Sequence, residues 1–84
     1  MSHTNQYIVF DLQADLATLE NRMEQQHKNI RTERENIELE QENGNYKAVA
    51  SSEEWISRYS AEYARLENEA LALKVDIIHR GGSL

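Results

Sequence analysis

Residues 56–77 have the sequence ISRYSAEYARLENEALALKVDI, which predicts an α-helix with one apolar side. Its apolar and aromatic side chains recur at alternating spacings of three and four residues, the period of one helical face. The members of this row are Ile56, Tyr59, Tyr63, Leu66, Ala70, Leu73 and Ile77. Such a row normally packs against another helix, so the fold depends on where a second row lies.

A second row precedes the first, and its members fall seven residues apart. They are Val9, Leu16, Met23, Ile30 and Ile37. Between the two rows, Asn43-Gly44-Asn45 is suited to ending one helix and turning the backbone. The sequence therefore predicts an all-α, antiparallel two-helix hairpin that resembles a coiled coil.

The expected hairpin is one domain, residues 1–84, because a chain of 84 residues has room for a single small core. Its segments are a lead (1–10), helix 1 (11–43), a turn (44–51), helix 2 (52–80) and a tail (81–84). Ser51 and Glu54 have the spacing of a helix-starting capping box, and Gly81-Gly82 supplies a stop. The lead contains Tyr7-Ile8-Val9-Phe10, which suits either a short strand or an extension of helix 1.

Composition excludes several classes of protein. The net charge of −6 disfavours direct nucleic-acid binding, and the lack of cysteine excludes disulfides and thiolate metal sites. No stretch approaches the ~20 apolar residues of a membrane span, and residues 1–30 lack a secretory signal. We therefore expect a cytoplasmic protein that does not associate with membranes.

Helix 1 has a second column of residues beside its seven-residue row, and this column changes from apolar to polar toward the turn. It consists of Leu12, Leu19, Gln26, Glu33 and Glu40. In an antiparallel hairpin, Tyr59 and Tyr63 lie level with this polar part, so we expect their hydroxyls to pair with Gln26 and Glu33.

Helix 2 carries a further apolar stripe on the side away from its first row. Its members are Ala64, Leu71, Val75 and Ile78. One partner helix cannot cover both sides, so the lead segment at 7–10 folds over this stripe or another chain covers it. A two-helix core is also small, which favours self-association as a homodimer or a larger helical bundle.

No residue pattern indicates catalysis or a cofactor. Glu24 with His27 and Asp76 with His79 have the carboxylate-histidine spacing of di-iron bundles, but in one hairpin the two pairs lie about 18 Å apart at 1.5 Å per residue. They cannot share a metal within one chain. We expect no enzyme activity, no metal and no cofactor.

Two other features are candidates for partner binding. Glu35, Glu38 and Glu42 belong to the densest run of charge, which is either a solvated face or an imitation of a nucleic-acid backbone. Trp55 lies near the turn with Tyr46, Tyr59 and Val49, where aromatic side chains either plug the fold locally or anchor a partner.

These observations predict a non-catalytic protein-binding module that acts through an apolar helical surface. Adaptor, chaperone and inhibitor roles all fit, because each needs only such a surface. The alternative is an acidic mimic that inhibits a nucleic-acid-binding protein, as some phage proteins do against host defences.

Overall fold

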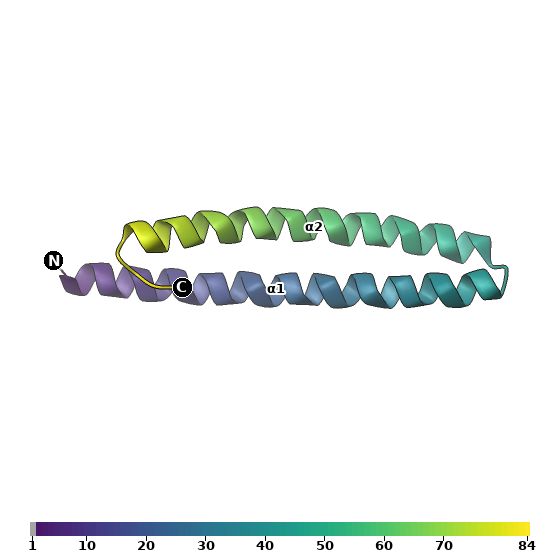
Figure 1. Cartoon of the computed structure of the whole chain (residues 1–84), viewed down its shortest axis with the longest axis horizontal. Helices are drawn as coiled ribbons and strands as arrows, with labels where there is room; N and C mark the ends of the chain where they lie inside the picture. The colour runs from purple at the N-terminus through teal and green to yellow at the C-terminus, as the bar shows by residue number, and fades with distance from the viewer. Residues whose placement is uncertain (1) are drawn as a thin grey trace. The chain divides into compact units, whose positions relative to one another are not determined.

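The computed structural model describes the backbone of residues 2–84 and the side chains of residues 8–84. Within these residues it contains two α-helices and no strand: α1, Ser2–Glu42, and α2, Tyr46–His79 (Figure 1). The prediction of an all-α protein with two packed helices is therefore confirmed. Neither helix of the described chain is long and apolar enough to cross a membrane.

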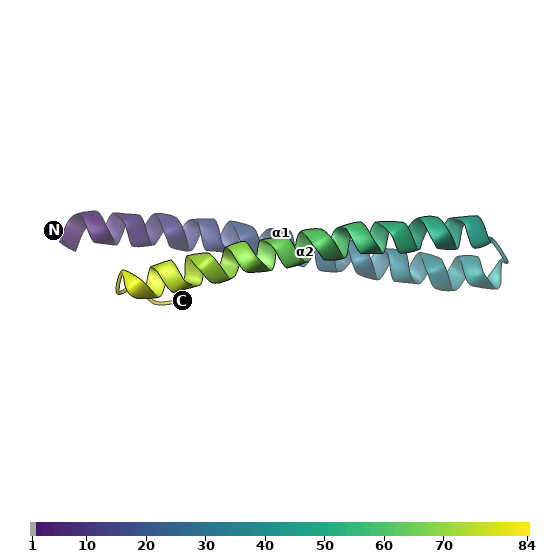
Figure 2. The same cartoon turned by 90° about the horizontal axis from the view of Figure 1, so that it is seen from above.

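The chain divides into two compact units. Unit 1 is formed by Met1–Met23 and Arg65–Leu84, and unit 2 by Glu24–Ala64. Each unit contains a segment of α1 beside a segment of α2 that runs in the opposite direction (Figure 2). Packing is therefore described one unit at a time.

The lead segment is part of α1, which begins at Ser2 and not near residue 11. Residues 2–42 contain no proline or glycine to interrupt a helix. Val9 continues the seven-residue row and packs against the core of unit 1. Tertiary packing of this row therefore prevails over the β propensity of Tyr7–Phe10, and the strand alternative is wrong.

Helix α2 begins at Tyr46, so the expected start at residue 52 is wrong. Asn45 is the residue that caps this helix: its Oδ1 accepts a hydrogen bond from the Ala48 amide at 3.3 Å, and its carbonyl accepts one from the Val49 amide at 3.2 Å. Because Asn45 caps the helix so early, Ser51 and Ser52 lie inside it. Ser52 is buried.

Both helices end in the same way, on a glycine with positive φ. Gly44 has φ 71° and Gly81 has φ 81°, a region that disfavours side chains with a Cβ. After α1, the Asn45 amide donates to the Glu40 carbonyl at 2.9 Å, and after α2 the Gly82 amide donates to the Ile77 carbonyl at 2.9 Å. The expected glycine stops are confirmed, within one residue of their predicted positions.

Unit 1 holds the main apolar core. Its buried residues are Leu16, Leu19, Leu66, Ala70 and Ile77, with Val9, Leu12, Met23 and Leu73 packed around them. Seven of these residues belong to the two rows that the sequence assigned to the helix-helix contact, and Leu12 and Leu19 belong to the second column of helix 1. The two rows therefore face each other here, as coiled-coil periodicity predicts.

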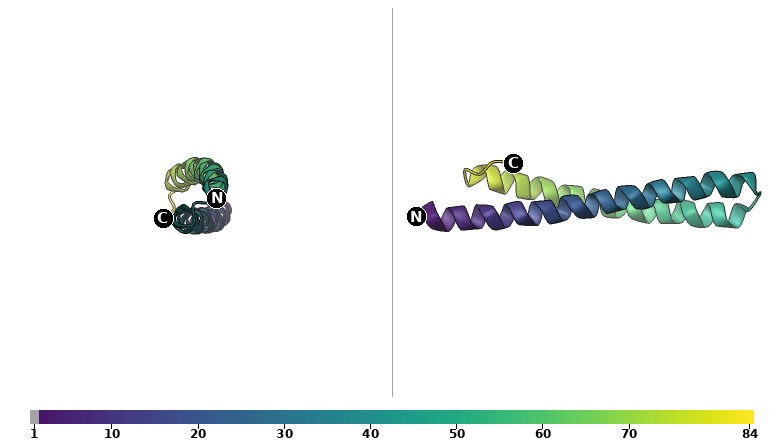
Figure 3. Two further views of the ribbon diagram at one scale, coloured as in Figure 1. Left: turned by 90° about the vertical axis from the view of Figure 1, so that its right-hand side faces the viewer. Right: turned by 90° about the horizontal axis from the view of Figure 1, so that it is seen from below.

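The segment after α2 turns back onto α1 within unit 1 (Figure 3). Gln13 Nε2 donates a hydrogen bond to the Ser83 carbonyl at 2.6 Å. A Cβ on Gly82 would lie 2.6 Å from Cγ1 of Val9 and 2.9 Å from Cγ2 of Ile77. The second glycine of Gly81-Gly82 is therefore needed for close approach, whereas the first is needed for its φ angle.

Unit 2 has little apolar interior. Val49 and Ser52 are its buried residues among those described. Ile30 and Ile37 are half-buried, and so are Gln26, Glu33 and Glu40 of the polar column. The loss of apolar character toward the turn therefore appears in the packing as well as in the sequence.

Adjacent isoleucines of α2 provide a matched test of this packing. Ile77 is 0% exposed and Ile78 is 56% exposed. We expect Ile77→Ala to lower the free energy of unfolding by about 2–4 kcal/mol, and Ile78→Ala by less than about 1 kcal/mol, because only the first leaves a cavity. Chemical denaturation followed by circular dichroism measures the loss of unfolding free energy in each variant. Repeating it at a second protein concentration separates folding from association, because only association makes the transition depend on concentration. Equal losses for the two variants would contradict the assigned face.

Candidate functional site

The side of α2 that faces away from the core of unit 1 carries large apolar side chains in solvent. Leu71, Val75 and Ile78 are 53%, 54% and 56% exposed, and we call these three residues the apolar row. Ala64, which belongs to unit 2, is also exposed on the same helix. The predicted stripe therefore lies on the outer side of α2, as its spacing indicated.

The helical period explains how one segment packs and yet remains apolar outside. Successive residues turn by about 100° around a helix, so Ile77 points into the core while Ile78 points away from it. A surface helix normally places polar residues at such outer positions. An apolar row in solvent is typical of a surface that binds a partner.

The lead segment does not cover the apolar row. Phe10 is 70% exposed, and residues 8–10 continue α1 as a helix without folding back. Tyr7 lies outside the residues whose side chains are described. The lead as cover for the stripe is therefore wrong, because the helical path of α1 directs Val9 into the core instead.

Trp55 forms a small aromatic cluster in unit 2. Its ring stacks on Tyr59 with 5.6 Å between centroids and 24° between planes, and the Arg58 guanidinium lies 5.1 Å from the ring centroid. Val49 is buried, whereas Trp55 is 43% exposed and Tyr46 is also exposed. Val49 thus fills the small core near the turn, whereas Trp55 and Tyr46 keep much of their surface in solvent.

The glutamates that suggested a nucleic-acid mimic are on the surface. Glu35, Glu38 and Glu42 are exposed, and none forms an ion pair with another residue in the described part of the chain. The exposed ion pairs on α2 instead include Arg58 with Glu54 and Arg80 with Asp76. The three carboxylates therefore lie in solvent without an ion pair, and Arg31 and Arg34 stand one helical turn before Glu35 and Glu38 on the same helix.

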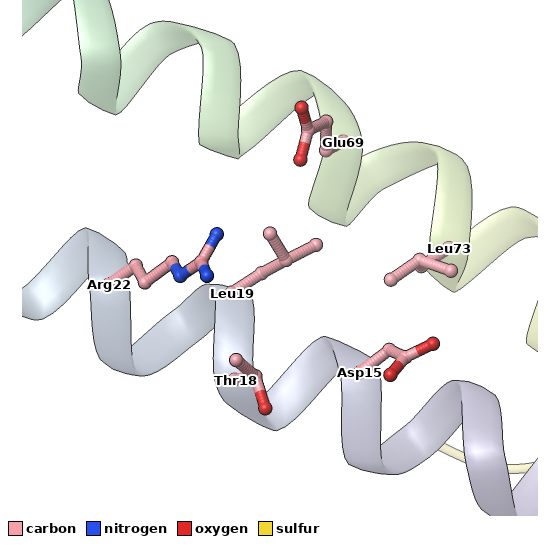
Figure 4. A pocket seen from close by; sticks show the side chains of 6 residues that line it. All are labelled: Asp15, Thr18, Leu19, Arg22, Glu69 and Leu73. Carbon is pink, nitrogen blue, oxygen red and sulfur yellow. The ribbon is translucent and has the colours of Figure 1, made fainter.

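A groove between α1 and α2 in unit 1 has a volume of about 370 Å³ (Figure 4). It is lined by Asp15, Thr18, Leu19, Arg22, Glu69 and Leu73. Glu69 pairs with Arg65 of the same helix. The sequence did not predict that Arg22 and Glu69 line one groove, because the two residues lie far apart in the chain. The groove combines opposite charges in an open setting, whereas small-molecule sites are usually enclosed and mostly apolar.

The two carboxylate-histidine pairs do not form a metal site in the described residues. No group of three His, Cys, Asp or Glu side chains among them is arranged to hold a metal ion. His27 instead contacts Tyr63 edge to face, with 4.5 Å between ring centroids. Asp76 forms an ion pair with Arg80 at 3.0 Å.

The expected hydrogen bond between a tyrosine and Gln26 is absent. Oε1 of Gln26 is buried and has no hydrogen-bond partner in the described chain. The ring of Tyr63 packs on His27 and that of Tyr59 on Trp55. Aromatic packing within unit 2 thus takes the place of the predicted tyrosine pairing, and it leaves one acceptor of Gln26 unsatisfied.

Comparisons with protein-family models, with curated proteins and with solved structures give no match to this chain. Functional inference therefore rests on the surfaces described above.

The unsatisfied Gln26 acceptor generates a stability prediction. We expect Gln26→Leu to raise the free energy of unfolding by about 1 kcal/mol, because it removes a buried polar atom that has no partner. The matched control is Gln25→Leu, at an exposed neighbouring position where Nε2 donates to Asn29 Oδ1 at 3.1 Å. Denaturant titration of both variants measures the difference. A lower stability for Gln26→Leu would mean that this side chain is satisfied in solution, for instance by water.

Proposed function

We propose that this protein is a non-catalytic protein-binding module whose contact surface is the apolar row of α2. The observation that carries the proposal is the exposure of Leu71, Val75 and Ile78 on a helix whose other side packs into the core of unit 1. Partner helices dock in this way, through apolar side chains at helical spacing. An adaptor, a chaperone for a helical segment and an inhibitor would each use such a row.

Self-association belongs to the same proposal. The apolar core of a two-helix domain is small, so a second chain that covers the apolar row adds burial that one chain lacks. A homodimer, or a bundle with a foreign helix, is the form in which we expect the protein to work.

The exposure of Glu35, Glu38 and Glu42 favours a second candidate, an acidic mimic that blocks a nucleic-acid-binding protein. A mimic depends on charge, and exposed charges are screened by salt over about 10 Å at 0.1 M. An apolar contact depends mainly on buried area, so it responds little to the same salt. Salt dependence therefore separates the two candidates.

A retention experiment in native extract tests the proposal. The wild-type chain, Leu71→Asp and the triple variant Glu35→Gln/Glu38→Gln/Glu42→Gln are immobilised, and the retained proteins are quantified at low and moderate salt. We expect partners that survive moderate salt and the triple variant but are lost with Leu71→Asp, because a buried unpaired carboxylate strongly opposes an apolar contact. Circular dichroism confirms that helicity is unchanged.

The reverse pattern contradicts the proposal. A partner that is lost with the triple variant or at moderate salt, and kept by Leu71→Asp, would establish the acidic mimic instead.

A further inference from the structure

The exposed side of α2 contains a heptad pattern that is longer than the apolar row itself. Asn68, Leu71, Val75 and Ile78 are spaced by three, four and three residues, and all four are exposed within unit 1. In the sequence, Ala61 and Ala64 continue the same spacing toward the amino end of the helix. Asn68 and Val75 form one column of this pattern, and Leu71 and Ile78 form the other.

We propose that this surface binds a second copy of the chain, with the two α2 helices parallel and in register. The inference rests on the proposed function, since it names the occupant of the apolar row. It is carried by the chemistry of the one polar residue among the four, Asn68.

The position of Asn68 distinguishes the possible orientations. In a parallel, in-register pair each residue meets its own counterpart, so the two Asn68 amides face each other, and each can donate to and accept from the other. In an antiparallel pair the columns exchange partners, and Asn68 faces the column of Leu71 and Ile78. Both amides would then be buried against aliphatic side chains without a partner.

Charges beside the row do not reverse this preference. The antiparallel register that sets Asn68 opposite Leu71 also brings Glu67 near Lys74 of the second copy, but exposed ion pairs contribute little. Burying an amide without a hydrogen-bond partner destabilises the dimer by more free energy than such an ion pair contributes. In the parallel pair, Glu67 faces Ala72 of the second copy, so no carboxylates are opposed. Val75 in the asparagine column and Leu71 in the other match the preference of two-stranded parallel coiled coils, whereas Ile78 in the Leu71 column does not, so Asn68 is the residue that specifies the pair.

Because the chain has no cysteine, single-cysteine variants report the orientation directly. The test variants are Leu71→Cys and Ile78→Cys, whose positions lie about 10 Å apart along the helix at 1.5 Å per residue. A disulfide requires Cα atoms within about 7 Å, so a crosslink identifies the residue that lies opposite. Thr18→Cys, at an exposed position on α1, controls for chance encounters.

In a parallel, in-register dimer each test variant forms a disulfide with itself. We expect both Leu71→Cys and Ile78→Cys to crosslink at micromolar concentration about tenfold faster than Thr18→Cys, because association raises the effective thiol concentration. Sedimentation of the wild-type chain should give the mass of two chains in the same range. Asn68→Leu should keep the dimer but allow cross-pairing in a mixture of the two cysteine variants, since the amide no longer selects the orientation.

Two results would overturn the inference. If the two variants crosslink only when mixed, or if only one of them crosslinks alone, the pair is antiparallel and Asn68 does not select the orientation. If neither exceeds Thr18→Cys and sedimentation gives a single chain, no second copy occupies the row. That second result leaves the proposed function standing, because retention of a foreign partner in native extract tests it separately.

Discussion

The packing of Leu66 and Ile77 between the helices of unit 1 is the interaction on which the rest of this structure depends. Both side chains are fully buried, and they pack in one cluster with Leu16 and Leu19 of α1. Because these residues occupy one side of α2, the helical period directs Leu71, Val75 and Ile78 to the opposite side. The packed core and the exposed row are thus two consequences of the same register.

Unit 2 is held by a different set of interactions. Its helices meet through half-buried polar side chains, the Val49 and Ser52 positions and the aromatic contact of His27 with Tyr63. The stack of Trp55 on Tyr59 lies within α2 itself. The caps around Gly44 and Asn45 satisfy backbone groups at the turn, which local hydrogen bonds achieve without a core. With less apolar burial, unit 2 is expected to open locally at a lower free energy than unit 1.

This distribution of stability bears on function. The proposed contact surface lies on the well-packed unit, so it is held on a rigid helix and loses little conformational entropy on binding. The exposed acidic side chains lie on the α1 segment of unit 2, where Glu35, Glu38 and Glu42 add charge but little packing. Such charge is suited to solubility and to the rate of association, whichever partner the apolar row binds.

Periodicity and residue type together were sufficient to predict the helical class, the core residues of unit 1, the glycine stops and the outer position of the apolar row. These features depend on local chemistry: a row at helical spacing, and a residue type that tolerates positive φ. The start of α2 was predicted wrongly because the sequence offers two capping residues, Asn45 and Ser51. In the structure Gly44 turns the backbone with a positive φ, and Asn45, the next residue, caps the helix. Tertiary structure also decided that the lead segment is helical, since Val9 gains a place in the core of unit 1 only as part of α1. It alone showed that Phe10 leaves the apolar row uncovered and that Gln26 lacks a partner, because exposure and hydrogen bonding depend on neighbours that are distant in sequence.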